Sequence, residues 1–217
     1  MNAALLPLAL LAVQSQPDRD ALKKLGITIV EPMDEGATAK MRARVDAALA
    51  KAGVAQAFEN VTTPTGGVVR HRASGLTCPL GRKGQEVAAQ PDGSALCRTR
   101  KPDVVYETRV VRGPAGATLD AVHAAAVRNA EAEPGYAPGG MTVSARPKPG
   151  SGRPEHRTIG YTSRVNGRLA STRVMVGLFD GWLLTERTTR TGARPDGFDM
   201  SDLVSEAMFG AKLKPAR

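Results

Sequence analysis

Residues 157–191 contain two turn signals that strongly constrain what this chain can fold into. Asn166-Gly167 and Asp180-Gly181 favour two-residue hairpin turns, because Asn, Asp and Gly tolerate the left-handed backbone that such turns need. Apolar and polar residues alternate in the runs beside each turn. The sequence therefore predicts a three-stranded antiparallel meander in which Val165 pairs with Arg168 across the first turn.

This register predicts that one face of the meander is buried and that the other is mostly wet. The buried face is expected to carry Ile159, Tyr161, Ser163, Val165, Ala170, Thr172, Val174 and Val176. The wet face is expected to carry Thr158, Thr162, Arg164, Ser171 and Arg173.

The alternation breaks near the second turn. Four large apolar residues lie on the otherwise polar face there: Met175, Phe179, Trp182 and Leu184. A helix over about residues 199–208 is the expected cover for them. Arg187 falls on the buried face, which favours a bulge in the strand or an end of the sheet core before it.

The rest of the chain alternates between helical and strand patterns. Helices are expected over residues 35–53 and 118–133, and strands over 57–62, 68–72, 85–89, 95–100 and 102–112. His123 lies beside the apolar stripe of the second helix and is expected to be half-buried and hydrogen-bonded. The predicted fold is α+β, with a curved antiparallel β-sheet of about six to eight strands flanked by two or three helices.

The first residues predict export. Residues 3–13 are apolar and uncharged, and their length suits the core of a signal peptide and falls short of a membrane span. We expect a signal peptide over 1–15, an N-terminal helical segment over 16–56 and a single α+β domain over 57–217. The protein is then periplasmic or secreted, without a stable membrane span after removal of the leader. No Lys or Arg precedes the apolar core, so an uncleaved anchor or a buried N-terminal helix remains an alternative.

The chain has two cysteines, Cys78 and Cys97. An even number in an exported chain favours a disulfide, which would stabilise the fold by about 3 kcal/mol. A zinc site or a redox pair would favour a C-x-x-C spacing, and this pair does not have it.

The formal net charge of +9 favours anionic partners, although a basic surface is also an ordinary solvated one. The string from Arg70 to Cys78 is either an anion-binding patch beside the disulfide or a strand, a Ser-Gly turn and a second strand. The candidate anion-binding surface consists of Arg70, Arg72, Arg164 and Arg173. A nucleic-acid partner is not expected, because export disfavours it and no basic motif interleaved with aromatic residues is present.

No motif nominates a catalytic, cofactor-binding or metal-ligating residue. The nucleophile motif G-x-S-x-G and the zinc motif H-E-x-x-H are both absent. Residues 113–118 faintly resemble a phosphate loop but lack its Lys-Ser/Thr ending, so a loop with an N-cap is the better interpretation. No cofactor is expected.

Two resemblances add to these patterns. The string RHRASGLTCPL, with the preceding FENVT and the second cysteine, resembles exported alphaproteobacterial proteins that have no assigned activity. From residue 100 onward, the order of a strand, a helix containing LDAVHAAAV, a meander with NG and DGW turns and a closing helix is similar to the Mog1/PsbP-like architecture. That resemblance implies a curved antiparallel sheet flanked by helices, and a protein that binds or assists.

The expected function is a non-enzymatic binding or accessory role in the cell envelope, with an envelope protein or an acidic polymer as partner. One alternative is an envelope enzyme, such as a hydrolase, whose site is assembled from distant residues. A deep pocket lined by His71 or His123 together with a carboxylate would favour that enzyme. A second alternative is a binder of acidic cell-surface polymers.

Overall fold

The computed structural model describes residues 31–139 and 155–192. The predicted signal peptide and the predicted helix over 199–208 therefore lie outside the described residues. The chain divides into two units, of which Met33–Arg217 contains every helix and strand described below. The predicted division into an N-terminal helical segment over 16–56 and an α+β domain over 57–217 stays a prediction.

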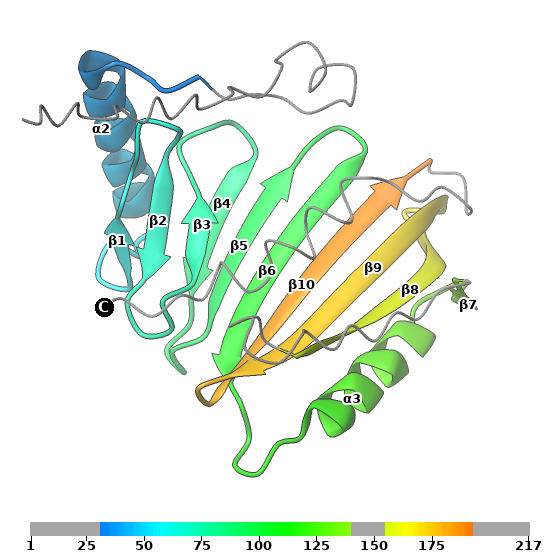
Figure 1. Cartoon of the computed structure of the whole chain (residues 1–217). Coiled ribbons are helices and arrows are strands. Elements are labelled where there is room, and N and C mark those ends of the chain that lie inside the picture. Colours follow the sequence, from blue (N-terminus) through cyan, green and yellow to red (C-terminus); the bar gives the residue numbers. More distant parts are fainter. Residues whose placement is uncertain (1–30, 140–154, 193–217) are drawn as a thin grey trace, which may run out of the picture. The chain divides into compact units, whose positions relative to one another are not determined.

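Two helices and ten strands are found in the described residues (Figure 1). Their bounds are α2 Glu35–Lys51, β1 Phe58–Asn60, β2 Val68–His71, β3 Thr77–Pro79, β4 Gln85–Ala89, β5 Ala95–Arg100, β6 Val104–Arg112, α3 Leu119–Glu131, β7 Ala137–Pro138, β8 His156–Val165, β9 Arg168–Phe179 and β10 Trp182–Thr191.

The larger sheet has seven strands in the order β4-β5-β6-β10-β9-β8-β7, and every neighbouring pair is antiparallel. The smaller sheet has three antiparallel strands in the order β1-β2-β3. Together with the helices, these sheets confirm the predicted α+β class.

Both predicted hairpin turns are present, and they fix the register of the meander β8–β9–β10. Asn166 has φ of 52° and Asp180 has φ of 42°, and the glycine after each is also left-handed. Val165 pairs with Arg168, as predicted. These turns match the right-handed twist of the strands that they join, which is why the chain can reverse in two residues.

Helix α3 packs on one face of β8 and β9, which we call the α3 face of the larger sheet. The helix begins at a Thr118 N-cap, whose hydroxyl accepts a hydrogen bond of 3.2 Å from the amide of Ala121. Ala130 is buried against a sheet cluster that consists of Ile159, Tyr161, Val174 and Val176. This core is the one predicted from the alternation in the meander.

The opposite face of the larger sheet belongs to a second core, shared with α2 and the smaller sheet. Val45 and Leu49 of α2 are buried in it. The same cluster contains the apolar residues that break the alternation of the meander, namely Met175, Trp182 and Leu184, with Phe179 partly buried against it. Within the described residues, these side chains thus pack with α2 and the smaller sheet, a cover that the sequence did not predict.

The prediction of a mostly wet second face is wrong for the middle of the meander. Thr158, Glu186 and Thr188 lie on that face, yet only 2–4% of their surface is exposed. Arg164, near the first turn, is exposed as predicted. Period-two alternation separates polar from apolar side chains, but it cannot reveal a polar face that folding also buries.

Candidate functional site

A groove of about 640 Å³ runs between α3 and the larger sheet. Its helical wall contains three small residues, Ala121, Ala125 and Ala126, which leave space above the strands. Its floor contains Val174, Val176 and Leu183. The space exists because Ala121 and Ala125 are too short to fill it, whereas Ala126 packs against the cluster that contains Val174 and Val176.

Three polar side chains close one end of the groove. The Tyr161 hydroxyl donates a hydrogen bond of 2.7 Å to Oε1 of Glu133, which lies just beyond α3. Arg187 of β10 binds both oxygens of the same carboxylate, at 2.8 Å to Oε1 and 3.1 Å to Oε2. Burial of the Tyr161 side chain, and then its hydrogen bond to Glu133, raise the pKa of Tyr161 above its ordinary value.

This cluster corrects the expectation for Arg187. Pairing of β10 with β6 and β9 continues without a bulge through Arg187. The guanidinium can lie on the buried face because Glu133 neutralises it and satisfies its donors.

A second ion-pair cluster holds the beginning of α3. Arg157 of β8 contacts Asp120 in the first turn of the helix at 3.1 Å and Glu155 at 3.0 Å. The hydrogen bond to Glu155 is the largest cause of a raised pKa of Arg157. The helix is therefore tied to the sheet at both ends, with the alanine-lined space between the two ties.

The groove continues along the α3 face toward β4. A second hollow of about 300 Å³ shares Arg109, Thr185 and Arg187 with the first. Arg98 crosses its floor and donates a hydrogen bond of 2.6 Å from Nε to Glu107. Arg109 is exposed where the two hollows meet. Its charge interacts with the exposed Asp92, and within the described residues it forms no closer ion pair.

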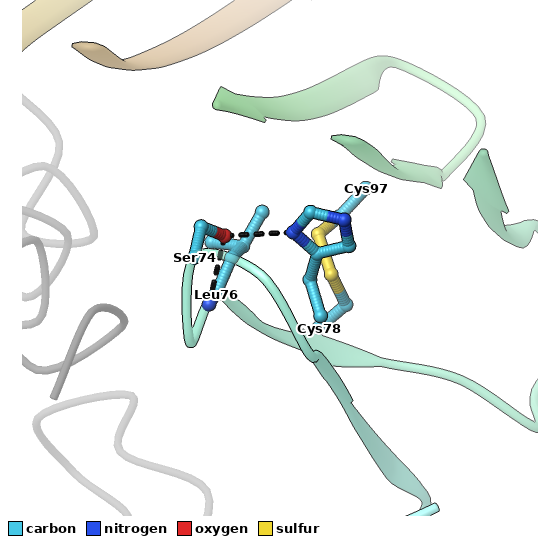
Figure 2. Close-up of a disulfide and its surroundings, with 5 residues drawn as sticks. Ser74, Leu76, Cys78 and Cys97 are labelled. Carbon is cyan, nitrogen blue, oxygen red and sulfur yellow. Dashed lines mark hydrogen bonds between the residues drawn. A yellow bond between two sulfur atoms is a disulfide. The ribbon is translucent and has the colours of Figure 1, made fainter. Parts of the chain in front are cut away.

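The cysteines form the predicted disulfide, which joins β3 of the smaller sheet to β5 of the larger one with Cα atoms 5.7 Å apart. The string beside it folds as a strand, a turn and a strand, which is the second of the two interpretations. The Oγ atom of Ser74 contacts Nδ1 of His71 at 2.9 Å and accepts a hydrogen bond from the Leu76 amide (Figure 2).

His71 is buried rather than placed in a pocket. Only 2% of its surface is exposed, and its ring packs against Phe58 and, edge-on, against Trp182. Burial lowers the pKa of His71.

The four arginines of the candidate anion-binding surface lie in two places. Arg70 is on β2 and Arg72 directly follows that strand, in the smaller sheet. Arg164 and Arg173 lie on β8 and β9 of the larger sheet. No contact between the two pairs is described, and whether either pair binds an anion stays a prediction.

Sequence reasoning missed the residues that build the groove. Neither His71 nor His123 lines it, whereas Arg109, Glu133 and Arg187 do. His123 is half-buried as expected, but its Nε2 atom has no hydrogen-bond partner in the described part of the chain. The one available signal was the position of Arg187 in the predicted register, which places a charged side chain on a face otherwise predicted to be buried.

Two further findings concern residues 31–139 and 155–192. These residues contain no cluster of three or more His, Cys, Asp or Glu side chains arranged to hold a metal ion. No helix in them has the length and apolarity needed to cross a membrane.

Comparison with known proteins gives distant structural likenesses. No protein-family model matches the chain, and a search of curated proteins finds no match. A crystal structure of PA94, a Pseudomonas aeruginosa protein of unknown function, is 15% identical, with a TM-score of 0.39 over 69% of this chain and 96% of that chain. The structure of LpqN, involved in cell envelope biogenesis of Mycobacterium tuberculosis, is 14% identical, with a TM-score of 0.34 over 61% of this chain and 82% of that chain.

Proposed function

We propose that this chain is an exported, non-enzymatic binding protein that holds an amphiphile, an apolar chain with an anionic head, in the groove beside α3. The observation that carries the proposal is the groove itself, about 640 Å³ of mostly apolar space between a helix and a sheet. Pockets for small ligands typically have volumes of roughly 300–1,000 Å³ and apolar walls with a few placed polar groups.

The apolar part of the ligand follows from the wall and the floor. Ala121, Ala125, Val174, Val176 and Leu183 offer an apolar surface. Burial of an acyl or alkyl chain there gains about 25 cal/mol per Å² of apolar surface removed from water. A polar group placed on these five residues would lose its hydration without compensation.

We infer that the ligand has an anionic head group from the way in which charged residues along the groove are paired. Glu133 is paired with Arg187, and Glu107 with Arg98. Arg109 is the guanidinium at the junction of the two hollows that has no ion-pair partner in the described residues. An anion there would meet an exposed cation and would compete for it with the exposed carboxylate of Asp92, whose charge also interacts with Arg109.

The paired carboxylates also support binding over catalysis. A general acid or base must be able to change its protonation state beside the substrate. Glu133 is held by a guanidinium and a phenol, and Glu107 is held by Arg98. The predicted enzyme alternative placed His71 or His123 beside a carboxylate in a pocket, and neither histidine lines this groove.

The disulfide supports export, because such bonds persist in oxidising compartments. Together with the apolar residues 3–13, it supports an address in the periplasm or outside the cell. Alkaline phosphatase fused after residue 20 is expected to become active outside the cytoplasm, and cytoplasmic retention of the fusion would contradict this part of the proposal. The order β6, α3 and β8–β10, with α3 on one face of the sheet, supports the Mog1/PsbP-like architecture as a further proposal.

Titration with a fluorescent fatty acid, such as a dansyl-labelled undecanoic acid, tests the groove. We expect saturable binding to the full chain and loss of that binding in Ala125→Phe, which fills the space. Ala124→Phe is the matched control, because Ala124 is exposed on the same helix and does not line the groove.

Arg109→Gln tests the head group separately. This variant is expected to bind the fatty acid more weakly and to bind the corresponding uncharged alcohol with unchanged affinity. Equal affinity of all three variants for the fatty acid would overturn the proposal, provided that their circular dichroism spectra match that of the native chain.

A further inference from the structure

The seven-stranded sheet has one basic end. Antiparallel pairing brings the end of β5, the start of β6, the end of β10 and the β8–β9 turn to the same end of the sheet (Figure 1). Five basic residues lie there, namely Arg100, Lys101, Arg164, Arg168 and Arg190, together with the acidic Asp103, and Arg100 pairs with Glu86. The opposite ends of these strands and their turns carry Asp92, Arg112, Glu155 and Asp180, so positive charge is in excess at one end of the strands and not at the other.

Three cations of this basic end are available to a partner. Lys101, Arg164 and Arg168 are exposed, and none of them forms an ion pair with a residue that the structure describes. Arg164 donates to the carbonyl of Gly167 at 3.1 Å, and Lys101 lies 5.6 Å from the ring centre of Tyr106. Both contacts orient the side chain and leave its charge uncompensated.

An apolar side chain stands among these cations. Leu169 is the one large hydrophobic side chain classed as exposed among residues 31–139 and 155–192, at 42%. It follows Arg168 directly and pairs with Arg164 across the hairpin. The two-residue turn through Asn166 and Gly167 holds these three side chains on a short, hydrogen-bonded tip.

We propose that this end of the sheet docks on an anionic phospholipid bilayer. Leu169 enters the interface, while Arg164, Arg168 and Lys101 meet headgroup phosphates. The combination of exposed cations with an apolar side chain fits a bilayer, whose surface is anionic and whose interior is apolar. A soluble acidic polymer would use the cations and would have no apolar phase to receive Leu169.

Cosedimentation of the full chain with phospholipid vesicles tests this docking. We expect binding to vesicles of phosphatidylglycerol and phosphatidylcholine in equal amounts, and weaker binding to phosphatidylcholine alone. The double variant R164Q/R168Q is expected to bind anionic vesicles about thirtyfold more weakly, since each cation near an anionic surface contributes about fivefold in affinity. L169S is expected to weaken the same binding. Any contribution of the apolar residues 3–13 to vesicle binding is the same in the native chain and in the variants.

The matched control is R42Q/R44Q, which removes the same charge from the exposed surface of α2. Equal losses for R42Q/R44Q and R164Q/R168Q would show that net charge alone drives binding, and would overturn the proposal. Failure of the native chain to prefer anionic vesicles would also overturn it. A third outcome would overturn it as well. In that outcome the chain binds soluble polyglutamate through Arg164 and Arg168, and L169S binds vesicles as tightly as the native chain does. The groove variant Ala125→Phe is expected to bind vesicles normally, which separates this proposal from the proposed function.

Discussion

The Tyr161 hydroxyl lies 2.7 Å from Oε1 of Glu133, and this hydrogen bond joins the buried face of β8 to the chain just beyond α3. Arg187 binds the same carboxylate from β10. One end of the groove is thus closed by three side chains that come from widely separated parts of the sequence.

Tyr161→Phe removes one hydrogen bond from this cluster and leaves the ion pair in place. We expect the free energy of unfolding to fall by about 1.5–3 kcal/mol, the range for a hydrogen bond to a charged acceptor. Chemical denaturation with urea at pH 7 measures the change. A loss well below this range would mean that the ring, which phenylalanine retains, and not the hydroxyl, is the main contributor.

The same variant is expected to change the response to alkaline pH. Burial and Glu133 raise the pKa of Tyr161 above its ordinary value of 10.0. The stabilisation that follows is fully present below pH 10 and is lost as the pH rises above it, because the unfolded chain releases the proton first. Urea denaturation between pH 9 and 11 should show a shallower loss of stability for Tyr161→Phe than for the native chain. Parallel curves would contradict the assignment.

His71 is expected to make the fold sensitive to mild acid. Its pKa is lowered from an ordinary value of 6.5 by burial, so its contribution is present above pH 6.5 and is lost as the pH falls below that value. His71→Gln does not titrate, and it should flatten the dependence of unfolding free energy on pH between 7.5 and 5. A dependence identical to that of the native chain would place the acid sensitivity elsewhere.

Removing the disulfide is expected to destabilise the fold. Cys78 and Cys97 are 19 residues apart, and closure of a loop of this size contributes about 3 kcal/mol by restricting the unfolded chain. Cys78→Ala with Cys97→Ala should therefore lower the urea midpoint markedly. Addition of dithiothreitol to the native chain should have a similar effect and should leave the double variant unchanged.

Gly67 and its neighbour Gly66 are expected to differ in how well they tolerate replacement by alanine. A Cβ atom at Gly67 would overlap the carbonyl oxygen of Leu80 on the adjacent chain segment and would press on Val45 of α2, whereas nothing lies within 4 Å of a Cβ at Gly66. Gly67→Ala should cost about 2 kcal/mol or more, and Gly66→Ala about 0.5 kcal/mol or less. Thermal denaturation of the two variants provides the comparison, and equal midpoints would be inconsistent with the packing described.

Much of the larger sheet could be predicted from local signals. The turns at Asn166-Gly167 and Asp180-Gly181 fixed the register of the meander, and apolar periodicity located α2 and α3 within a few residues. These signals are short-range, because turn chemistry and period depend on residues close in sequence.

The groove could not be predicted, because its parts meet only through tertiary pairing. Glu133, Tyr161 and Arg187 carry no shared motif, and small alanines on a helix usually indicate close packing rather than space. The cover over Met175 and Trp182 was missed for the same reason. Alternation shows that an apolar surface must be covered, and it does not identify the covering segment.

The pairing of β6 with β10 has a consequence for the order of folding. The strands β8, β9 and β10 are consecutive and joined by two-residue turns, and hairpins of this kind form in about 1–10 μs. Contacts between β6 and β10 instead join strands that are separated in sequence by α3 and the rest of the meander, and such non-local contacts form more slowly. In a chain that emerges N-terminus first, β6 emerges before β10, so the edge of β6 stays unpaired until the meander has also emerged.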